Sequence, residues 1–315
     1  MEIYSQLVNK LWPREKHPIL RLRVYMVYRI FPQSFSVTSF FVWRLYSKIR
    51  FGTTRWVRLD LGKLCVRSAD YRAYWISQTR GTQKEIIKTW ITLAKLKPTL
   101  CIDVGANYGE FTLAIASFGI PTISIEPNPS IVNCLNTSFE DYQNISIVHA
   151  AISDKEGMLP FHFNPQYSGS ASLSKEMSAA KVFLGQKGQT HSTEVRSVRL
   201  DSLVLNEFRI NPKSLILKID VETFELDVLR SAFTLLSKCD WWRAIVEFNP
   251  IAIRNTNGNV EEVWKIYRNF SGLIIGQDIT ENILTMTKIL PESHPLFSCD
   301  LLIGRGSVDV IPCGR

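Results

Sequence analysis

The sequence predicts an α/β fold built on a mostly parallel sheet, and two observations support this. From Thr99 onward, short apolar runs alternate with segments of helical periodicity. The apolar runs are hydrophobic at successive positions, which is typical of strands that helices cover on both faces. The chain has 315 residues, of which 45% are hydrophobic and 21% charged, so it is long enough to bury a large core.

The predicted strands and helices follow one another in a regular order. The apolar runs that we expect to be strands are TLCIDV, PTISIE, ISIVHA, SLILKID and RAIVEF, which begin at residues 99, 121, 145, 214 and 243. The segments that we expect to be helices are 110–118, 129–139, 225–237 and 260–269.

Two further elements are expected before the first of these strands. Residues 56–67 alternate in polarity and predict a hairpin that turns at Leu61-Gly62. Residues 83–96 predict an amphipathic helix that ends before Pro98.

We divide the chain at about residue 75. Residues 1–75 form a basic, aromatic and partly helical arm or subdomain, and residues 76–315 form the sheet domain. An insertion at about 155–200 interrupts the alternation of strands and helices. It contains the Gly/Ser-rich stretch QYSGSAS and a predicted strand, EVRSVRL, and we expect it near the edge of the sheet.

The positive charge of the chain is concentrated in the arm. The net charge is +8, and residues 1–60 hold eleven Lys and Arg against three acids, so the remainder is close to neutral. Interleaved Arg and aromatic side chains suit an anionic membrane surface. The alternative is that the arm packs on the sheet, with Trp43, Tyr46 and Phe51 in its core.

Cysteine usage and the N-terminus predict a cytoplasmic protein that is either soluble or peripheral, and the basic arm favours attachment to the inner face of the membrane. The six cysteines are far apart and form no C-x-x-C pair, which argues against a zinc site or a disulfide scaffold. Cys101 and Cys134 are expected to be buried thiols. No secretory signal is visible, and the longest uncharged run near the start, from Ile30 to Trp43, is shorter than the roughly 20 residues of a membrane span.

The stretch CIDVGANYGE at residues 101–110 predicts a ligand site after the first strand of the alternating series. Its candidate binding residues are Asp103, Gly105, Asn107 and Gly109. The spacing D-x-G-x-N-x-G lacks the G-x-G-x-x-G of dinucleotide sites, so we expect a ligand without a pyrophosphate. An acid at the strand end repels phosphate but accepts a hydrogen bond from an ammonium group, which suits the amino-acid end of S-adenosylmethionine.

The next two strand ends support the same ligand. Glu126 ends the following strand and is placed to accept hydrogen bonds from a ribose, with Asn128 beside it. Ala150 and Ala151, after the third strand, are small enough for an adenine to lie against the backbone. Asp154 is a candidate acceptor for the adenine amine.

With these motifs in order, the chain resembles the FkbM-type S-adenosylmethionine-dependent methyltransferases over roughly residues 80–250. The matching stretches are CIDVGANYGEFTLAIA, SIEPNPSIVNCLN, NISIVHAAISDKEG, SGSASLS, VRSVRLDSL, LILKIDVETFELDVL and AIVEFNP. The resemblance implies a seven-stranded Rossmann-like methyltransferase sheet whose antiparallel last strand lies in FSCDLLIGRG. It also implies O-methylation, with a hydroxyl of a sugar, glycan or glycolipid precursor as acceptor. Thr223 stands where the family usually has glycine.

Methyl transfer to a hydroxyl usually needs a base, and KIDVETFE places carboxylates at the end of the fourth strand. Asp220 is the first candidate for the catalytic base, followed by Glu222 and Glu225. A divalent cation held by Asp220 and Glu222 is possible, since hard cations prefer carboxylate oxygens. The alternative is that Glu225 caps the following helix and Asp220 contacts only backbone or cofactor.

Other residues have candidate roles of their own. Glu247 ends the fifth strand and is a candidate substrate contact, with a strand-end salt bridge as the alternative. His149 is expected in the core, and Asp201 is expected to cap a helix. The acidic stretch KIDVETFELDVLR argues against nucleic acid as a partner, and the oligomeric state stays open.

Two other functions stay open beside O-methylation. One is N-methylation of an amino sugar or small metabolite. The other, suggested by Thr223, is a catalytically silent module that binds the cofactor or acts as a scaffold.

Overall fold

The computed structural model describes residue 45 and residues 53–175, 190–275 and 290–306. The chain divides into Met1–Thr53 and Thr54–Arg315, and the account below concerns the second unit. Predictions about the arm before residue 53, including its contact with a membrane, lie outside the described residues. The hairpin, which the sequence prediction grouped with the arm, belongs to the second unit.

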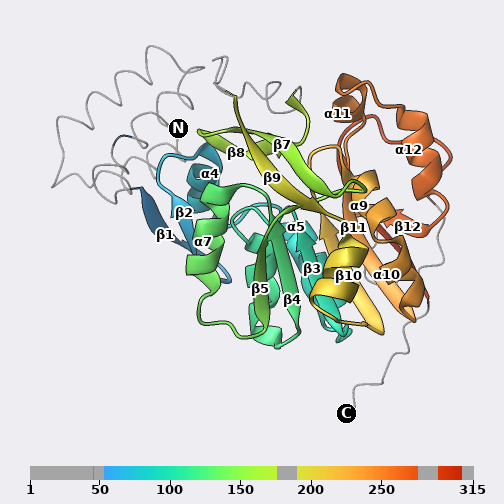
Figure 1. The fold of residues 1–315 in the computed structure, drawn as a ribbon, viewed down its shortest axis with the longest axis horizontal. Helices are drawn as coiled ribbons and strands as arrows, with labels where there is room; N and C mark the ends of the chain where they lie inside the picture. The colour runs from blue at the N-terminus through green and yellow to red at the C-terminus, as the bar shows by residue number, and fades with distance from the viewer. Residues whose placement is uncertain (1–44, 46–52, 176–189, 276–289, 307–315) are drawn as a thin grey trace, which may run out of the picture. The chain divides into compact units, whose positions relative to one another are not determined.

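Within the described residues, seven strands form the main sheet in the order β12–β13–β11–β10–β3–β4–β5 (Figure 1). β13 is antiparallel to both neighbours, and the other pairs are parallel. The predicted fold, including the antiparallel strand in FSCDLLIGRG, is therefore confirmed. The strands are β3 (Leu100–Val104), β4 (Thr122–Glu126), β5 (Ile145–His149), β10 (Ser214–Ile219), β11 (Trp241–Phe248), β12 (Ser271–Ile274) and β13 (Cys299–Arg305).

Helices cover both faces of this sheet because successive strand residues point to opposite sides. Cys101 and Ile216 pack into one cluster with the helices α5 (Lys84–Ala94) and α6 (Glu110–Ile115), which η2 (Ala116–Phe118) continues. Leu100, Ile102 and Leu217 belong to the cluster on the other face. That face is covered by α9 (Glu225–Ser231), α10 (Phe233–Lys238), α11 (Pro250–Asn255) and α12 (Val260–Tyr267).

The helix predicted at 225–237 is two helices, because the chain leaves helical geometry at Ala232. Asp201 stabilises the second of them from a distance. Its carboxylate accepts hydrogen bonds from the N–H groups of Thr234 and Leu235, at 3.3 and 2.7 Å. Asp201 therefore caps a helix, as expected, but the helix is α10.

The hairpin prediction is also confirmed, as β1 (Thr54–Leu59) and β2 (Gly62–Arg67), followed by α4 (Tyr71–Thr79). The hairpin packs on α7 (Pro129–Phe139). Val57 and Leu64 share a buried cluster with Leu135 and Phe139 of that helix. The hairpin, which precedes the main sheet in the chain, thus shares a buried cluster with a helix of the sheet domain.

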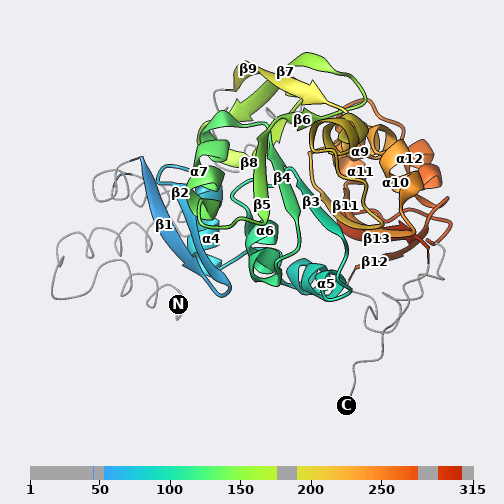
Figure 2. The same cartoon turned by 60° about the horizontal axis from the view of Figure 1, so that its bottom comes forward.

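The insertion forms a second sheet over the carboxyl ends of β3, β4 and β5 (Figures 1 and 2). Its strand order is β6–β9–β7–β8. The strands are β6 (Ala151–Ile152), β7 (Gly157–Asn164), β8 (Tyr167–Ser172) and β9 (His191–Val198), and η3 (Ser202–Glu207) follows them. Because ligands of open α/β sheets bind at the carboxyl ends of strands, this second sheet lies where it can cover a site.

The core prediction for His149 is wrong. β5 is the last strand in the order of the sheet, and His149 is exposed at its end, with Nε2 3.0 Å from the carbonyl oxygen of Pro127. Cys101 and Cys134 are buried free thiols, as predicted.

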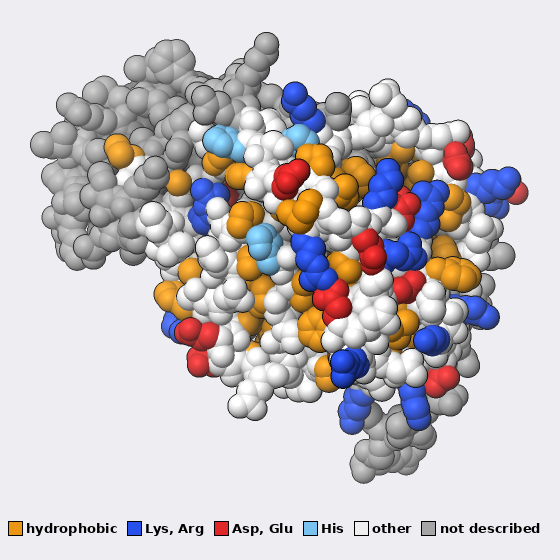
Figure 3. Space-filling model, viewed as in Figure 1, with side chains coloured by type: hydrophobic (Ala, Val, Ile, Leu, Met, Phe, Trp, Pro, Cys, Tyr) orange, Lys and Arg blue, Asp and Glu red, His pale blue; other side chains and the backbone are white. Residues whose placement is uncertain are grey.

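Charged residues of both signs are interspersed over the face shown in Figure 3. In the part of the chain that the structure describes, no helix combines the length and apolar character needed to cross a bilayer.

Candidate active site

A cavity opens where β3, β4, β5 and β10 end, and β8 borders it from above. Its open volume is about 880 Å³, with the space at its mouth included. The cavity is lined by strand-end residues of the main sheet, by residues of the insertion and by residues that precede the sheet. The lining residues used below are Arg72, Gln83, Asp103, Gly105, Ala106, Asn107, Glu110, Phe111, Glu126, Ala150, Ala151, Ser168, Ser172, Lys218, Asp220 and Glu222.

The glycine stretch after β3 borders the cavity with its backbone. Gly105 has a φ of +78°, and a Cβ there would collide with the carbonyl oxygen of Asp220. Asn107 also has a positive φ, of 48°, and its side chain contacts Ser168 of the insertion. Gly109 has a different role outside the cavity lining, because a Cβ there would lie 2.6 Å from the ring of Phe139.

Two predicted acids are buried at this end of the sheet. Asp103 accepts a hydrogen bond from Thr112 at 2.8 Å, and burial raises the pKa of its carboxyl to about 6. Glu126 accepts hydrogen bonds from the N–H groups of Asn107 and Asn128, both at 2.9 Å. Burial raises the pKa of Glu126 to about 7, although these hydrogen bonds oppose the shift.

Not every predicted cofactor residue reaches the cavity. Ala151 does, but Asn128 caps α7 by accepting from the N–H of Ser130, and neither it nor Asp154 lines the cavity. Asn128 has a local capping role that the strand-end pattern alone does not distinguish from binding.

Asp220 enters the cavity from the end of β10, beside a lysine that the sequence analysis did not single out. Lys218 is 1% exposed in its side chain, and its Nζ lies 3.1 Å from Asp220 Oδ2 and 5.0 Å from the ring centre of Phe111. Burial opposes a charge on Lys218, but nearby carboxylates, Asp220 first, raise its pKa above the usual value. The sequence signal that was available is a lysine two residues before the strand-end acid, on the same face of the strand.

Glu225 stabilises the turn after Asp220 through hydrogen bonds to its backbone. Glu225 Oε1 accepts hydrogen bonds from the N–H groups of Val221 and Thr223, at 3.1 and 3.2 Å. Glu222 lines the cavity and has a φ of 55°, and Thr223 has a φ of 83°. A φ of this sign favours glycine, so the backbone at Thr223 suits the glycine that the resemblance implies at this position.

Glu247 lies close to the cluster of acids but outside the cavity lining. Its carboxylate accepts a hydrogen bond from Ser298 at 3.0 Å. Burial, and then the charge of Asp220, raise its pKa well above the usual range. A contact with the substrate stays a prediction.

The structure adds no support for a divalent cation at Asp220 and Glu222, which the sequence left open. Among the described residues, no three His, Cys, Asp or Glu side chains are grouped in a way that can hold a metal ion.

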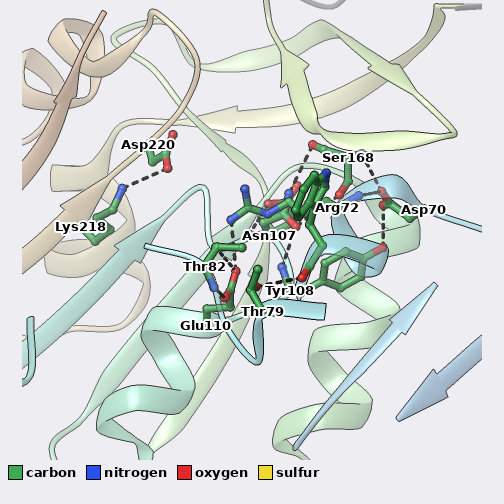
Figure 4. A network of polar contacts seen from close by, with 12 residues as sticks. Asp70, Arg72, Thr79, Thr82, Asn107, Tyr108, Glu110, Ser168, Lys218 and Asp220 are labelled. Carbon is green, nitrogen blue, oxygen red and sulfur yellow. Dashed lines mark hydrogen bonds and ion pairs between the residues drawn. The ribbon is translucent and has the colours of Figure 1, made fainter. Parts of the chain in front are cut away.

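Arg72 and Gln83, which precede the main sheet in the chain, also line the cavity. The sequence analysis did not identify them as site residues. Asp70 accepts hydrogen bonds from the hydroxyl of Tyr108, at 2.7 Å, and from the N–H of Ser168, at 3.2 Å (Figure 4). Arg72 points toward Glu110, with 3.3 Å between Nη2 and Oε2. These residues are single letters without a motif, so only the folded chain brings them together.

A comparison with protein families finds one match. Residues 103–270, more than half of the chain, match the model of the methyltransferase FkbM domain. No curated protein matches the chain.

Several solved structures are similar in fold. A precorrin-6y C5,15-methyltransferase from Geobacter metallireducens has 10% identity and a TM-score of 0.36, over 72% of this chain and 90% of that one. A methyltransferase from Geobacter sulfurreducens has 14% identity and a TM-score of 0.36, over 75% and 85%. An SAM-dependent methyltransferase from Agrobacterium tumefaciens has 11% identity and a TM-score of 0.35, over 81% and 70%. On the family match, the chain belongs to the methyltransferase FkbM domain family, whose members are S-adenosylmethionine-dependent methyltransferases.

Proposed function

We propose that the protein binds S-adenosylmethionine in this cavity and transfers its methyl group to a hydroxyl of a sugar, glycan or glycolipid precursor. The family implies this methyl donor. The donor-binding part of the proposal is supported by the backbone of Gly105, Ala106 and Asn107, which borders the cavity, and by Glu126 and Ala151 at the next two strand ends.

The observation that carries the proposed reaction is the position of Asp220. It lines the cavity at the end of β10, with 23% of its side chain exposed, and is paired with a buried lysine. A charged lysine neighbour favours the ionised carboxylate, which is the form that can accept a proton. An acceptor hydroxyl held against Asp220 would lose its proton to that carboxylate as the oxygen attacks.

The bound donor supplies an electrophilic methyl carbon on a sulfonium, and the chain supplies position and a proton acceptor. In such a transfer the acceptor oxygen would take the methyl group as its proton passes to Asp220, and the donor would leave as its neutral thioether. The insertion sheet would limit the access of water to the reacting groups, because β8 borders the cavity and Ser172 donates a hydrogen bond to the carbonyl oxygen of Glu222 at 3.0 Å.

We also propose that the protein attaches peripherally to the cytoplasmic face of the membrane, where lipid-linked glycans are assembled. The support for this attachment is the excess positive charge of residues 1–60, interleaved with aromatic side chains.

Two measurements test the function. Calorimetric titration with S-adenosylhomocysteine measures donor binding, and a Glu126→Ala variant should bind more weakly. Incubation with donor labelled at the methyl group, followed by analysis of glycan and glycolipid extracts, measures transfer. Label on oxygen supports the proposal, label on nitrogen replaces it with N-methylation, and binding without any transfer indicates a silent module.

A further inference from the structure

Among the described residues, three buried side-chain atoms of the cavity lining have no hydrogen-bond partner, and one of them, Lys218 Nζ, forms an ion pair with Asp220. The other two are Nε of Arg72 and Oε1 of Gln83. Both residues line the cavity. The first atom is a donor and the second an acceptor, and a buried polar atom without a partner destabilises a fold by about 1–3 kcal/mol. A ligand that offers both an acceptor and a donor would satisfy the two atoms together.

One buried carboxylate binds both Arg72 and the residue before Gln83. Glu110, which is 4% exposed in its side chain, pairs through Oε2 with Arg72 Nη2. The same carboxylate accepts hydrogen bonds from Thr82, at 2.6 Å from its N–H and 2.8 Å from its hydroxyl (Figure 4). Thr82 directly precedes Gln83, so Glu110 holds both positions against the N-terminus of α6.

Two basic side chains, Arg72 and Lys218, are among the described residues that line the cavity, and they have different ion-pair partners. Acids line the cavity at Asp103, Glu126 and Asp220. Lys218 pairs with Asp220 at 3.1 Å through its one ammonium group. Arg72 pairs with Glu110 through Nη2 but keeps a separate buried N–H, at Nε, that no described residue accepts. A planar guanidinium is well suited to bind a carboxylate. An anionic group that enters this acidic cavity would therefore find its partner at Arg72.

We propose that Arg72 and Gln83 bind the α-amino-acid end of the methyl donor, with the carboxylate on the Arg72 guanidinium and the ammonium on the Gln83 amide oxygen. The inference rests on the proposed methyl donor. Both residues precede residue 103, where the family match begins, so that match does not assign them.

A structural role for the two residues is the competing explanation. In that case Arg72 only holds Glu110, and its replacement would disturb the whole cavity. The two explanations differ in which ligands are affected. 5′-Methylthioadenosine has the adenosine and thioether of S-adenosylhomocysteine but no amino-acid end, so it reports on the rest of the cavity.

The experiment is a titration of both ligands into the wild-type chain and into the variants Arg72→Met and Gln83→Met. Each variant should bind S-adenosylhomocysteine at least about tenfold more weakly, with the affinity for 5′-methylthioadenosine unchanged. Arg72→Lys, which keeps the positive charge, should recover part of the loss. Arg230→Met removes a charge outside the cavity lining and should change neither affinity.

The outcomes separate the inference from the proposed function. A wild-type chain that binds neither ligand overturns the proposed donor, and with it this inference. Wild-type binding that Arg72→Met and Gln83→Met leave intact, or weaken equally for both ligands, overturns the inference alone. If a melting curve shows that Arg72→Met is unfolded, Arg72→Lys and Gln83→Met replace it in the comparison of the two ligand affinities.

Discussion

The carbonyl oxygen of Asp220 lies where it would collide with the Cβ of any side chain at Gly105. The two strands meet here, and the N–H of Asp220 donates to the carbonyl oxygen of Val104 at 3.1 Å. This close approach brings the backbone of the proposed donor-binding loop next to that of the proposed catalytic base.

Gly105→Ala should destabilise the protein and weaken the binding of S-adenosylhomocysteine. Gly119→Ala is the matched control, since Gly119 also has a positive φ, of +69°, but a Cβ added there would meet no atom within 4 Å. The control should lose only the backbone penalty, about 1–2 kcal/mol. Urea denaturation compares the two, and an equal loss of stability in both variants would show that the collision with Asp220 does not matter.

Asp220→Asn should lower the rate of methyl transfer by about 10²- to 10⁴-fold, because it removes the proton acceptor and keeps the shape. Calorimetry should find its affinity for S-adenosylhomocysteine nearly unchanged. Glu222→Gln, at the neighbouring lining position, is the comparison. Near wild-type turnover in Asp220→Asn, together with a large loss in Glu222→Gln, would transfer the role to Glu222.

Thr223→Gly should stabilise the protein, by about 1 kcal/mol, because a β-branched residue at a φ of 83° is strained. Asn257→Gly is the control. Asn257 also has a positive φ, of 58°, but asparagine tolerates it better, so the gain there should be smaller. Thermal melting measures both, and a destabilised Thr223→Gly would mean that its side chain makes contacts that outweigh the strain.

Glu225→Gln should change how stability depends on pH. Burial raises the pKa of Glu225 from 4.5 to about 7 in the folded protein. A carboxyl with a raised folded pKa contributes stability that is fully present below pH 4.5 and is lost as the pH rises through about 7. The amide stays neutral and can still accept from Val221 and Thr223, so the variant should gain on the wild type by about 3 kcal/mol at about pH 8 relative to about pH 4. Urea denaturation at several pH values tests this, with the exposed Glu194→Gln as control; parallel curves for wild type and Glu225→Gln would refute it.

The arm should attach to anionic vesicles at low salt and release them at high salt. Each Lys or Arg near such a surface contributes about 1 kcal/mol, and salt screens the attraction. Vesicle flotation measures this, and a variant with Arg21, Arg23 and Arg29 replaced by Ser should float less. A chain that ignores anionic vesicles at low salt, and unfolds when residues 1–50 are deleted, would instead have the arm as part of its core.

The strands could be predicted from the sequence because each is a short apolar run with a turn signal after it. The break of the predicted helix at Ala232 could not, because its apolar periodicity continues across the break. The cap that stabilises α10 comes from Asp201, more than 30 residues earlier, and no local pattern encodes such a contact. The burial of His149 was predicted wrongly, because an apolar run in the sequence does not show whether its strand lies at the edge of the sheet.

The residues of the candidate site also fall into two groups, those that the sequence predicts and those that it does not. Gly105, Glu126 and Asp220 could be found because they end strands, and the ends of parallel strands meet at one edge of a sheet. Arg72 and Gln83 could not, because they reach the cavity through the tertiary contacts of Glu110. Their position is a property of the packed chain and of no stretch of sequence.

Asp70 also bears on the order in which the molecule folds. Its carboxylate joins the start of α4 to Tyr108 and Ser168, which are 38 and 98 residues further along the chain. During synthesis, α4 leaves the ribosome long before Ser168 does, and contacts of such long range form slowly. The side of the cavity that Ser168 borders is therefore completed only after β8 has emerged, so the cavity assembles later in synthesis than α4 does.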